Sequence, residues 1–284
     1  MNESCYLDGQ ASLEGLTVLA GRARRLILEM THRAGMGHTG GSLSEVELLV
    51  ALYFGGMRSI DPSRPDRPDR DRFILSKGHA TPGYYSVLAL RGYFSPELLE
   101  TFDELGTPLQ AHPDMHKLPG VDMSSGSLGQ GLSCGIGMAL AAMADPSLGS
   151  FRTFVLMGDG ELQEGQVWEA AGYAGALRLP GIVAIVDCNA VQLSTATGPF
   201  QAPDAVAARF RAFGWDASGV DGHDLAALMP AIASARERAG RGPVALVATT
   251  VKGKGVSFME GRCEWHGKAP DDGELARALA ELGS

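Results

Sequence analysis

The second half of the chain alternates short apolar runs with segments of helical pattern, and this alternation limits the folds that the chain can adopt. Apolar runs occupy residues 154–157, 182–186 and 244–248, and helical patterns occupy 162–177, 205–213 and 224–239. A strand that is apolar at every position is buried on both faces, which occurs mainly in parallel sheets covered by helices. The alternation therefore predicts an α/β fold, with a doubly wound, mainly parallel sheet and helices on both faces.

The first half of the chain predicts helices joined by polar connections. Apolar residues recur every three or four positions from Leu16 to Met30, and residues 43–53 carry a second helical pattern. The charged segment 61–72 contains three prolines and is expected as a surface connection. Since there is no internal repeat and no long linker, we expect one domain over residues 1–284, with residues 1–20 and 275–284 as peripheral termini.

Composition and charge exclude several classes of protein. The 284 residues carry a net charge of −9 without a basic run, so nucleic acid and anionic membranes are not expected as partners. No apolar run approaches the roughly 20 residues of a membrane span, and the N-terminus lacks a signal pattern. The four cysteines lie far apart without a CxxC pair, which indicates reduced thiols and a cytoplasmic protein.

Polar residues follow two of the buried runs at the point where each run ends. Asp159 stands between Gly158 and Gly160 after the first run, and Asn189 follows the second. Their separation, 189 − 159 = 30 residues, fits one strand–helix–strand crossover, and ligands of such sheets bind beyond the carboxyl ends of the strands. Two oxygen ligands there suit Mg²⁺ or Ca²⁺ together with a diphosphate. A glycine turn with a helix-capping side chain would give the same pattern without a metal.

A glycine-rich segment, Ser124-Ser-Gly-Ser-Leu-Gly-Gln-Gly131, opens a helix of small residues. It resembles a dinucleotide-binding loop, but no clear strand precedes it and no acidic residue follows at the required distance. Glycine amides at a helix start suit an anion, although close helix packing would need the same small residues. A second glycine-rich segment, Lys252-Gly-Lys-Gly255, lacks the pattern of a P-loop.

Five of the seven histidines adjoin glycine or proline, which places them on irregular segments. They are His38, His79, His112, His223 and His266. Histidines on loops are typical of a cleft, although a structural role for each remains open. No HExxH or GxSxG motif is present, so zinc hydrolysis and nucleophilic serine catalysis are not supported.

These motifs follow one another in an order that resembles a known family. They include Gly37-His38, Ser76-Lys77-Gly78-His79-Ala80, Gln110-Ala-His112-Pro-Asp114, Ser125 to Gly131, Gly158-Asp159-Gly160 with Asn189, Lys252 to Phe258, and Trp265-His266. Together they resemble the N-terminal, diphosphate-binding half of transketolase, over about residues 20–280. Thr39 and Ser127 depart from the family's motifs, since each stands where the family usually has proline.

The resemblance implies that thiamine diphosphate and Mg²⁺ (or Ca²⁺) bind to this chain. It assigns the metal to Asp159, Asn189 and the Val191 carbonyl. The residues that it places around the cofactor are His79, Gly126, Ser127, Leu128, Gly158, Asp159, Gly160, Glu161, Asn189 and His266. The residues to which it gives catalytic roles are His38, His79, His112, His266 and Glu164, the last as the link between paired cofactor sites in a dimer.

The same resemblance implies a transferase that moves a two-carbon ketol unit from a ketose or its phosphate to an aldehyde, through an enamine. Full transketolases carry a second domain that holds the aminopyrimidine ring, and we expect this chain to stop after the first domain. It would therefore be active only with a separate C-terminal subunit carrying the pyrimidine-binding domain, in an α2β2 heterotetramer.

Other functions remain open at this point. One is a thiamine-dependent 2-oxo acid decarboxylase or carboligase subunit of a biosynthetic pathway. Another is a non-catalytic homologue that only binds a partner, although the intact Asp159, Asn189, His79 and His266 argue against it. A nicotinamide-dependent dehydrogenase would need a GxGxxG motif directly after a first strand, and that motif is missing.

Overall fold

The chain folds around a five-stranded sheet in which every pairing is parallel. A computed structural model describes residues 11–283, so residues 1–10 of the expected peripheral N-terminus and Ser284 lie outside the described residues. The strands are β1 (Arg72–Leu75), β2 (Thr153–Gly158), β3 (Ile182–Cys188), β4 (Asp216–Asp221) and β5 (Val244–Thr249). Their order in the sheet is β1-β2-β3-β5-β4, which confirms the predicted α/β fold with a mainly parallel sheet.

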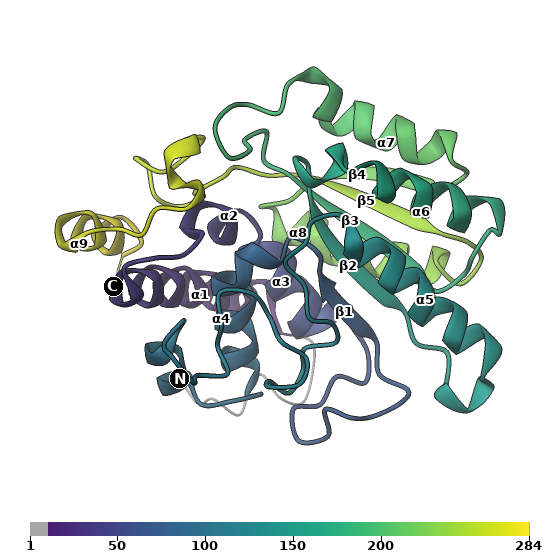
Figure 1. Cartoon of the computed structure of the whole chain (residues 1–284), viewed down its shortest axis with the longest axis horizontal. Helices are drawn as coiled ribbons and strands as arrows, with labels where there is room; N and C mark the ends of the chain where they lie inside the picture. The colour runs from purple at the N-terminus through teal and green to yellow at the C-terminus, as the bar shows by residue number, and fades with distance from the viewer. Residues whose placement is uncertain (1–10, 284) are drawn as a thin grey trace.

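Helices cover both faces of the sheet (Figure 1). They are α1 (Leu13–Ala34), α2 (Thr39–Ser44), α3 (Val46–Ala51), α4 (Thr81–Arg91), α5 (Gln130–Ala144), α6 (Gly165–Ala176), α7 (Pro203–Ala212), α8 (Leu225–Arg238) and α9 (Asp272–Glu281). Helices α5, α6 and α7 pack on one face, and α1, α3, α4 and α8 pack on the other. The predicted helices over 162–177, 205–213 and 224–239 correspond to α6, α7 and α8.

The uninterrupted apolar runs follow from this double coverage. Along β2, Phe154 and Leu156 belong to the core beneath α1, α3, α4 and α8. Val155 and Met157 belong to the core beneath α5, α6 and α7. Because neighbouring side chains of a strand point to opposite faces, both sets must be apolar when both faces are covered.

The helical pattern of residues 43–53 is interrupted in the structure. Helix α2 ends at Ser44, and α3 begins at Val46. The residue between them, Glu45, has φ −98° and ψ 2°, and its buried carboxylate lies 2.9 Å from the Lys77 ammonium. A tertiary ion pair therefore coincides with the break, which periodicity along the chain does not reveal.

Both segments expected as peripheral termini contain helix. Helix α1 begins at Leu13 after an N-cap at Ser12, and its residues Leu16 and Leu19 are buried in the core. Helix α9 starts with a capping box at Asp271 and packs against α1. Residues 13–20 and 275–281 thus lie in helices.

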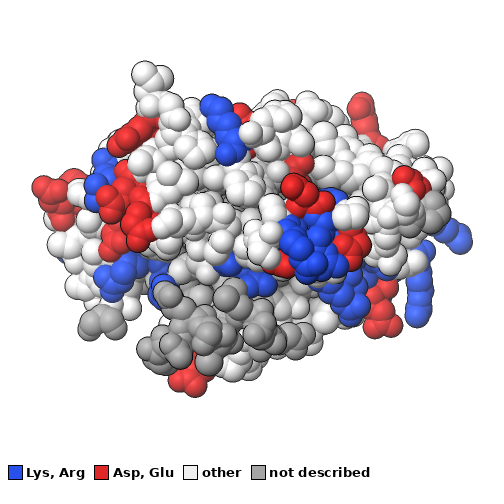
Figure 2. Space-filling model, turned by 90° about the horizontal axis from the view of Figure 1, so that it is seen from below, with Lys and Arg blue, Asp and Glu red and all other residues white. Residues whose placement is uncertain are grey.

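The charged connection before β1 lies on the surface, as its composition predicts. Its arginines pair with neighbouring aspartates, Arg64 with Asp61 at 2.9 Å and Arg67 with Asp69 at 2.5 Å. On the face seen from below, Lys and Arg side chains lie beside Asp and Glu side chains (Figure 2). Among the helices of residues 11–283, none is both long and apolar enough to cross a bilayer.

Candidate functional site

The predicted site residues gather around one cavity beyond the carboxyl ends of β1, β2, β3 and β5. Its volume is about 480 Å³. The predicted residues that line it are His38, His79, His112, Gly126, Leu128, Gly158, Asp159, Gly160, Glu161, Asn189, Val191 and His266. A second cavity of about 550 Å³, lined by α1, residues 96–100 and Leu275, contains none of them. These predicted residues lie close together because parallel strands present all their carboxyl ends at one edge, and their functional roles stay predictions.

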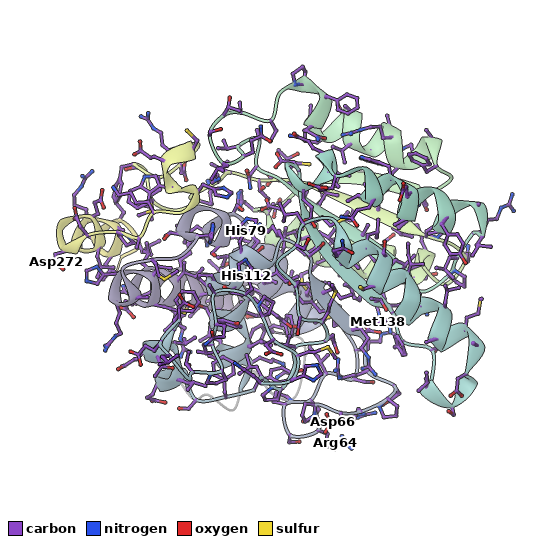
Figure 3. All side chains as sticks on the ribbon, in the orientation of Figure 1. Arg64, Asp66, His79, His112, Met138 and Asp272 are labelled. Atoms are coloured by element: carbon purple, nitrogen blue, oxygen red, sulfur yellow. The ribbon has the colours of Figure 1, made fainter. Side chains whose placement is uncertain are left out.

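Three of the histidines form a cluster in the cavity wall, here termed the histidine triangle. The ring centres of His38 and His79 lie 4.9 Å apart, those of His38 and His266 5.3 Å, and those of His79 and His266 5.2 Å. His38 precedes α2, His79 lies in the turn after β1, and His266 lies in a turn before α9. Figure 3 shows His79 near the centre of the molecule, beside His112 of the same cavity wall.

Burial keeps the histidine triangle neutral. Burial, and then the charge of Lys77, lower the pKa of His79 well below its ordinary value. Burial, and then the charge of Lys252, lower the pKa of His266 to about 4, and burial also lowers the pKa of His38. A neutral imidazole has one donor and one acceptor nitrogen, so near pH 7 these rings can bind hydroxyl groups without adding charge.

His112 and the glycine-rich segment form another wall of the cavity. Gly126 has φ +150°, and a Cβ on it would lie 2.9 Å from His112 Cδ2. Glycine is therefore required there both by the backbone conformation and by the neighbouring ring. The segment passes through Gly129, at φ +85°, into α5, and Gly126 and Leu128 line the cavity. The expectation that this segment binds an anion stays a prediction.

Glu161 joins three of the segments around the cavity. Its Oε1 accepts hydrogen bonds from the Gly129 amide at 2.8 Å and from the Ser76 hydroxyl, and its Oε2 accepts from the Gly158 amide at 3.1 Å. The Ser76 hydroxyl accepts in turn from the Gly131 amide at 3.2 Å. The buried carboxylate thus holds the ends of β1 and β2 against the start of α5. Direct contact of Glu161 with the cofactor remains a prediction, because these contacts are all within the protein.

Replacing Glu161 with Gln is expected to lower the free energy of unfolding by about 1–3 kcal/mol. The side-chain NH₂ of Gln cannot accept a hydrogen bond, so at least one buried donor loses its partner. Urea unfolding of the purified chain measures the loss. Glu169→Gln is the matched control, because Glu169 is exposed on α6. Equal stability of the Glu161→Gln variant and the parent chain would contradict the role of Glu161 in holding the ends of β1 and β2 against the start of α5.

The predicted metal ligands Asp159, Asn189 and Val191 lie where β2 and β3 end, and are here termed the metal corner. Asp159 Oδ2 accepts hydrogen bonds from the Ala190 amide at 2.7 Å and the Thr197 hydroxyl at 3.2 Å. Asn189 Oδ1 accepts from the Val191 amide at 3.1 Å. Ala190 has φ +64°, which is uncommon for a residue with a side chain and marks local strain in the backbone.

The oxygens of the metal corner suit a hard divalent cation. Burial, and then the charge of Asp187, raise the pKa of Asp159 to about 6. The ionised carboxylate therefore lacks a nearby positive charge that would stabilise it. A bound cation would supply that charge. Within residues 11–283, no three His, Cys, Asp or Glu side chains form a metal-binding group. The ligands would therefore include the Asn189 side-chain oxygen, the Val191 carbonyl and oxygens of the bound molecule, a set that fits Mg²⁺ or Ca²⁺.

Two buried lysines of the cavity wall are functional candidates that sequence reasoning missed. The first, Lys77, donates to Asp187 Oδ2 at 2.5 Å and to the Gly41 carbonyl at 3.1 Å, and lies 2.9 Å from Glu45 Oε2. Although burial opposes its charge, these two carboxylates raise the pKa of Lys77. Burial raises the pKa of Glu45 to about 8. The charge of Lys77 is thus balanced mainly by Asp187, beneath the cavity.

The second lysine, Lys252, contacts neutral groups. Its ammonium donates to His266 Nδ1 at 2.7 Å and to the Val191 carbonyl at 3.5 Å. Burial, and then the charge of Lys77, lower the pKa of Lys252 to about 8. An anion in the cavity would stabilise its charged form. The sequence signal for this residue is a lysine between a buried strand and a glycine turn, which a search for the P-loop pattern does not detect.

Three singled-out residues lie outside the cavity wall. Ser127 and Glu164 are exposed. Glu164 directly precedes α6 and lies against Gly129, where an added Cβ would lie 2.8 Å from the Glu164 Cβ. Their predicted roles in cofactor binding and in linking paired sites stay predictions. His223 is the one member of the five histidines on irregular segments that does not line the cavity.

Comparisons with known proteins show the family to which this chain belongs. The family model for the thiamine diphosphate-binding domain of transketolase matches residues 17–284. A 6-deoxy-6-sulfo-D-fructose transketolase subunit of Clostridium sp. (strain MSTE9) is 44% identical over 91% of this chain and 93% of its own length. An apulose-4-phosphate transketolase subunit of Phocaeicola vulgatus is 37% identical over 95% of this chain and 94% of its own length.

Solved structures give the same result for the fold. The transketolase of Pichia stipitis, in complex with sedoheptulose 7-phosphate, superposes with a TM-score of 0.86 and 31% identity. It covers 94% of this chain, whereas this chain spans only 40% of its length. The chain therefore belongs to the transketolase family, as its thiamine diphosphate-binding part. The predicted family and transferase class are confirmed, and the 2-oxo acid decarboxylase and non-catalytic alternatives are not favoured.

Proposed function

We propose that this chain is the diphosphate-binding subunit of a two-component transketolase, which moves a two-carbon ketol unit from a ketose or ketose phosphate to an aldehyde. The observation that supports this most directly is that the histidine triangle, the metal corner and the Lys252 ammonium face one cavity. Relatives that match along almost their whole length are themselves named as transketolase subunits.

The cavity residues would divide the work of holding the cofactor. Thiamine diphosphate, when bound, supplies the electron sink that breaking a carbon–carbon bond requires and that no side chain offers. The metal corner would hold Mg²⁺ between Asp159, Asn189 and the Val191 carbonyl. Lys252 and the backbone of Gly126 to Leu128 would hold the diphosphate, since an ammonium and glycine amides both suit an anion.

The histidine triangle and His112 would act on the sugar. Neutral imidazoles can donate to one hydroxyl and accept from another, which orients a polyhydroxylated ketose. The same nitrogens can move a proton to or from a sugar oxygen when its charge changes. These roles need the rings to be uncharged near pH 7, which burial favours for His38, His79 and His266.

A partner subunit would complete the site. We expect it to carry the pyrimidine-binding domain and most groups that hold a sugar phosphate, because relatives that match along almost their whole length are named as transketolase subunits. The exposed Glu164 and Ser127 would face other subunits of an α2β2 heterotetramer. The spacing of the cysteines supports a cytoplasmic location.

Reconstitution tests this function. This chain, its partner subunit, thiamine diphosphate and Mg²⁺ are mixed, and turnover of xylulose 5-phosphate with ribose 5-phosphate is followed. We expect turnover only in the complete mixture, and each of the two proteins by itself is the control. A second donor, 6-deoxy-6-sulfo-D-fructose, is included because a relative named for it is 44% identical. The proposal would be contradicted if the complete mixture showed no turnover with any donor and no cofactor-dependent assembly.

A further inference from the structure

A largely buried cluster of polar side chains lies outside the cavity. Its members are Arg24 on α1, Glu47 on α3 and His223 in the loop after β4, here termed the Glu47 cluster. Arg24 Nη2 lies 2.7 Å from Glu47 Oε1 and 2.8 Å from Oε2. His223 Nδ1 lies 2.9 Å from Glu47 Oε2. None of these three residues lines the cavity, so the proposed function gives them no role.

The contacts of His223 fix which of its nitrogens carries the proton. The Val251 amide donates to Nε2 at 2.8 Å, so Nε2 is an acceptor and Nδ1 is the donor to Glu47. Burial opposes the charge of Glu47, but the hydrogen bond from His223 and the charge of Arg24 hold its pKa below the ordinary value. His223 is thus a neutral bridge between a buried carboxylate and a backbone amide.

The Glu47 cluster holds the backbone on both sides of Lys252. Val251, whose amide binds His223, directly precedes Lys252. On the other side, Arg24 Nε donates to the Lys254 carbonyl at 2.9 Å. A Cβ on Gly255 would lie 2.9 Å from Arg24 Nε, so the turn after Lys252 packs directly on the cluster. Two anchored backbone groups therefore enclose the residue whose ammonium reaches the cavity.

We propose that His223 is a positioning residue, which holds the Val251 amide so that the Lys252 ammonium stays at the metal corner. That ammonium lies 2.7 Å from His266 Nδ1 and 3.5 Å from the Val191 carbonyl. A shift of the backbone at Val251 would move it out of reach of both. The placement of Lys252 rests on these contacts, and only its role toward diphosphate rests on the proposed function.

Two substitutions separate the two contacts of His223. The side chain of Asn reaches the place of Nδ1, so His223→Asn keeps a donor for Glu47 and loses the acceptor for the Val251 amide. The side chain of Gln reaches the place of Nε2, so His223→Gln keeps that acceptor. Hydrogen exchange read by mass spectrometry should show faster exchange around Val251 for His223→Asn only. Equal exchange in both variants and the parent chain, or equal acceleration in both variants, would overturn the proposal.

A double-mutant cycle then tests whether the effect passes through Lys252. In the complex with the partner subunit, His223→Asn should weaken binding of thiamine diphosphate by about tenfold. In a Lys252→Met background it should have no further effect, whereas additive losses would show a merely structural role and overturn the proposal. His116→Asn changes an exposed histidine and serves as the control. If the parent complex does not bind thiamine diphosphate, the proposed function fails, and the exchange experiment still decides about His223.

Discussion

Replacing Asp159 with Asn is expected to raise the Mg²⁺ concentration for half-maximal activity of the reconstituted complex by roughly 10²–10³-fold. The single Asn side-chain oxygen can accept a hydrogen bond from only one of the Gly160 and Ala190 amides, which lie 2.8 Å from Asp159 Oδ1 and 2.7 Å from Asp159 Oδ2. The loop therefore loses at least one of these contacts, and the negative charge that a divalent cation needs is lost as well. Initial rates measured over a Mg²⁺ series give the shift.

The control for this substitution is an aspartate of the same chain that lies away from the cavity. Asp66 is exposed in the charged connection before β1, at the lower edge of Figure 3. Asp66→Asn removes the same charge from the chain and should leave the Mg²⁺ dependence unchanged. If Asp159→Asn also leaves it unchanged, Asp159 is not a metal ligand.

Replacing His266 with Asn is expected to lower kcat by about 10²–10⁴-fold, the usual contribution of a proton-transferring side chain. The Asn oxygen takes the place of Nδ1, so the Lys252 ammonium, now 2.7 Å from that atom, keeps an acceptor. The rest of the ring, which lies beside His38 and His79, is lost. Steady-state rates at saturating donor and cofactor measure kcat.

Two further measurements separate catalysis from cofactor binding in this variant. The half-saturating concentration of thiamine diphosphate should change little, because the contact with Lys252 survives. His116→Asn, at an exposed histidine, should leave kcat unchanged. A normal kcat with weakened cofactor binding would assign His266 to cofactor binding alone and contradict its role toward the sugar.

The architecture could be predicted because its causes are local and repeated. The run Ile182 to Val186 is apolar at every position, and each of its residues is buried in the sheet. The position of β1 at the edge of the sheet could not be predicted from the sequence, because β1 pairs with β2 across the long segment between Leu75 and Thr153. Strand order depends on such distant contacts and has no signature in the pattern of a single strand.

The candidate site was proposed from residue types that follow strand ends. Asp159 and Asn189 come directly after β2 and β3, and both line the cavity. Lys252 was missed, because its direction depends on turns that pack against Arg24 and His223 from distant elements. The hydrogen bonds by which Glu161 joins three segments were missed for a similar reason, since their donors are far apart along the chain.

Calorimetric titration of thiamine diphosphate into an equimolar mixture of this chain and its partner subunit tests most directly whether the cavity holds the diphosphate through a divalent cation. The titration is run once with Mg²⁺ and once with EDTA. We expect saturable binding with Mg²⁺, loss of binding with EDTA, and recovery when excess Mg²⁺ is added. Equal affinity in Mg²⁺ and EDTA, or no binding in Mg²⁺, would contradict a metal-bridged diphosphate site at Asp159 and Asn189.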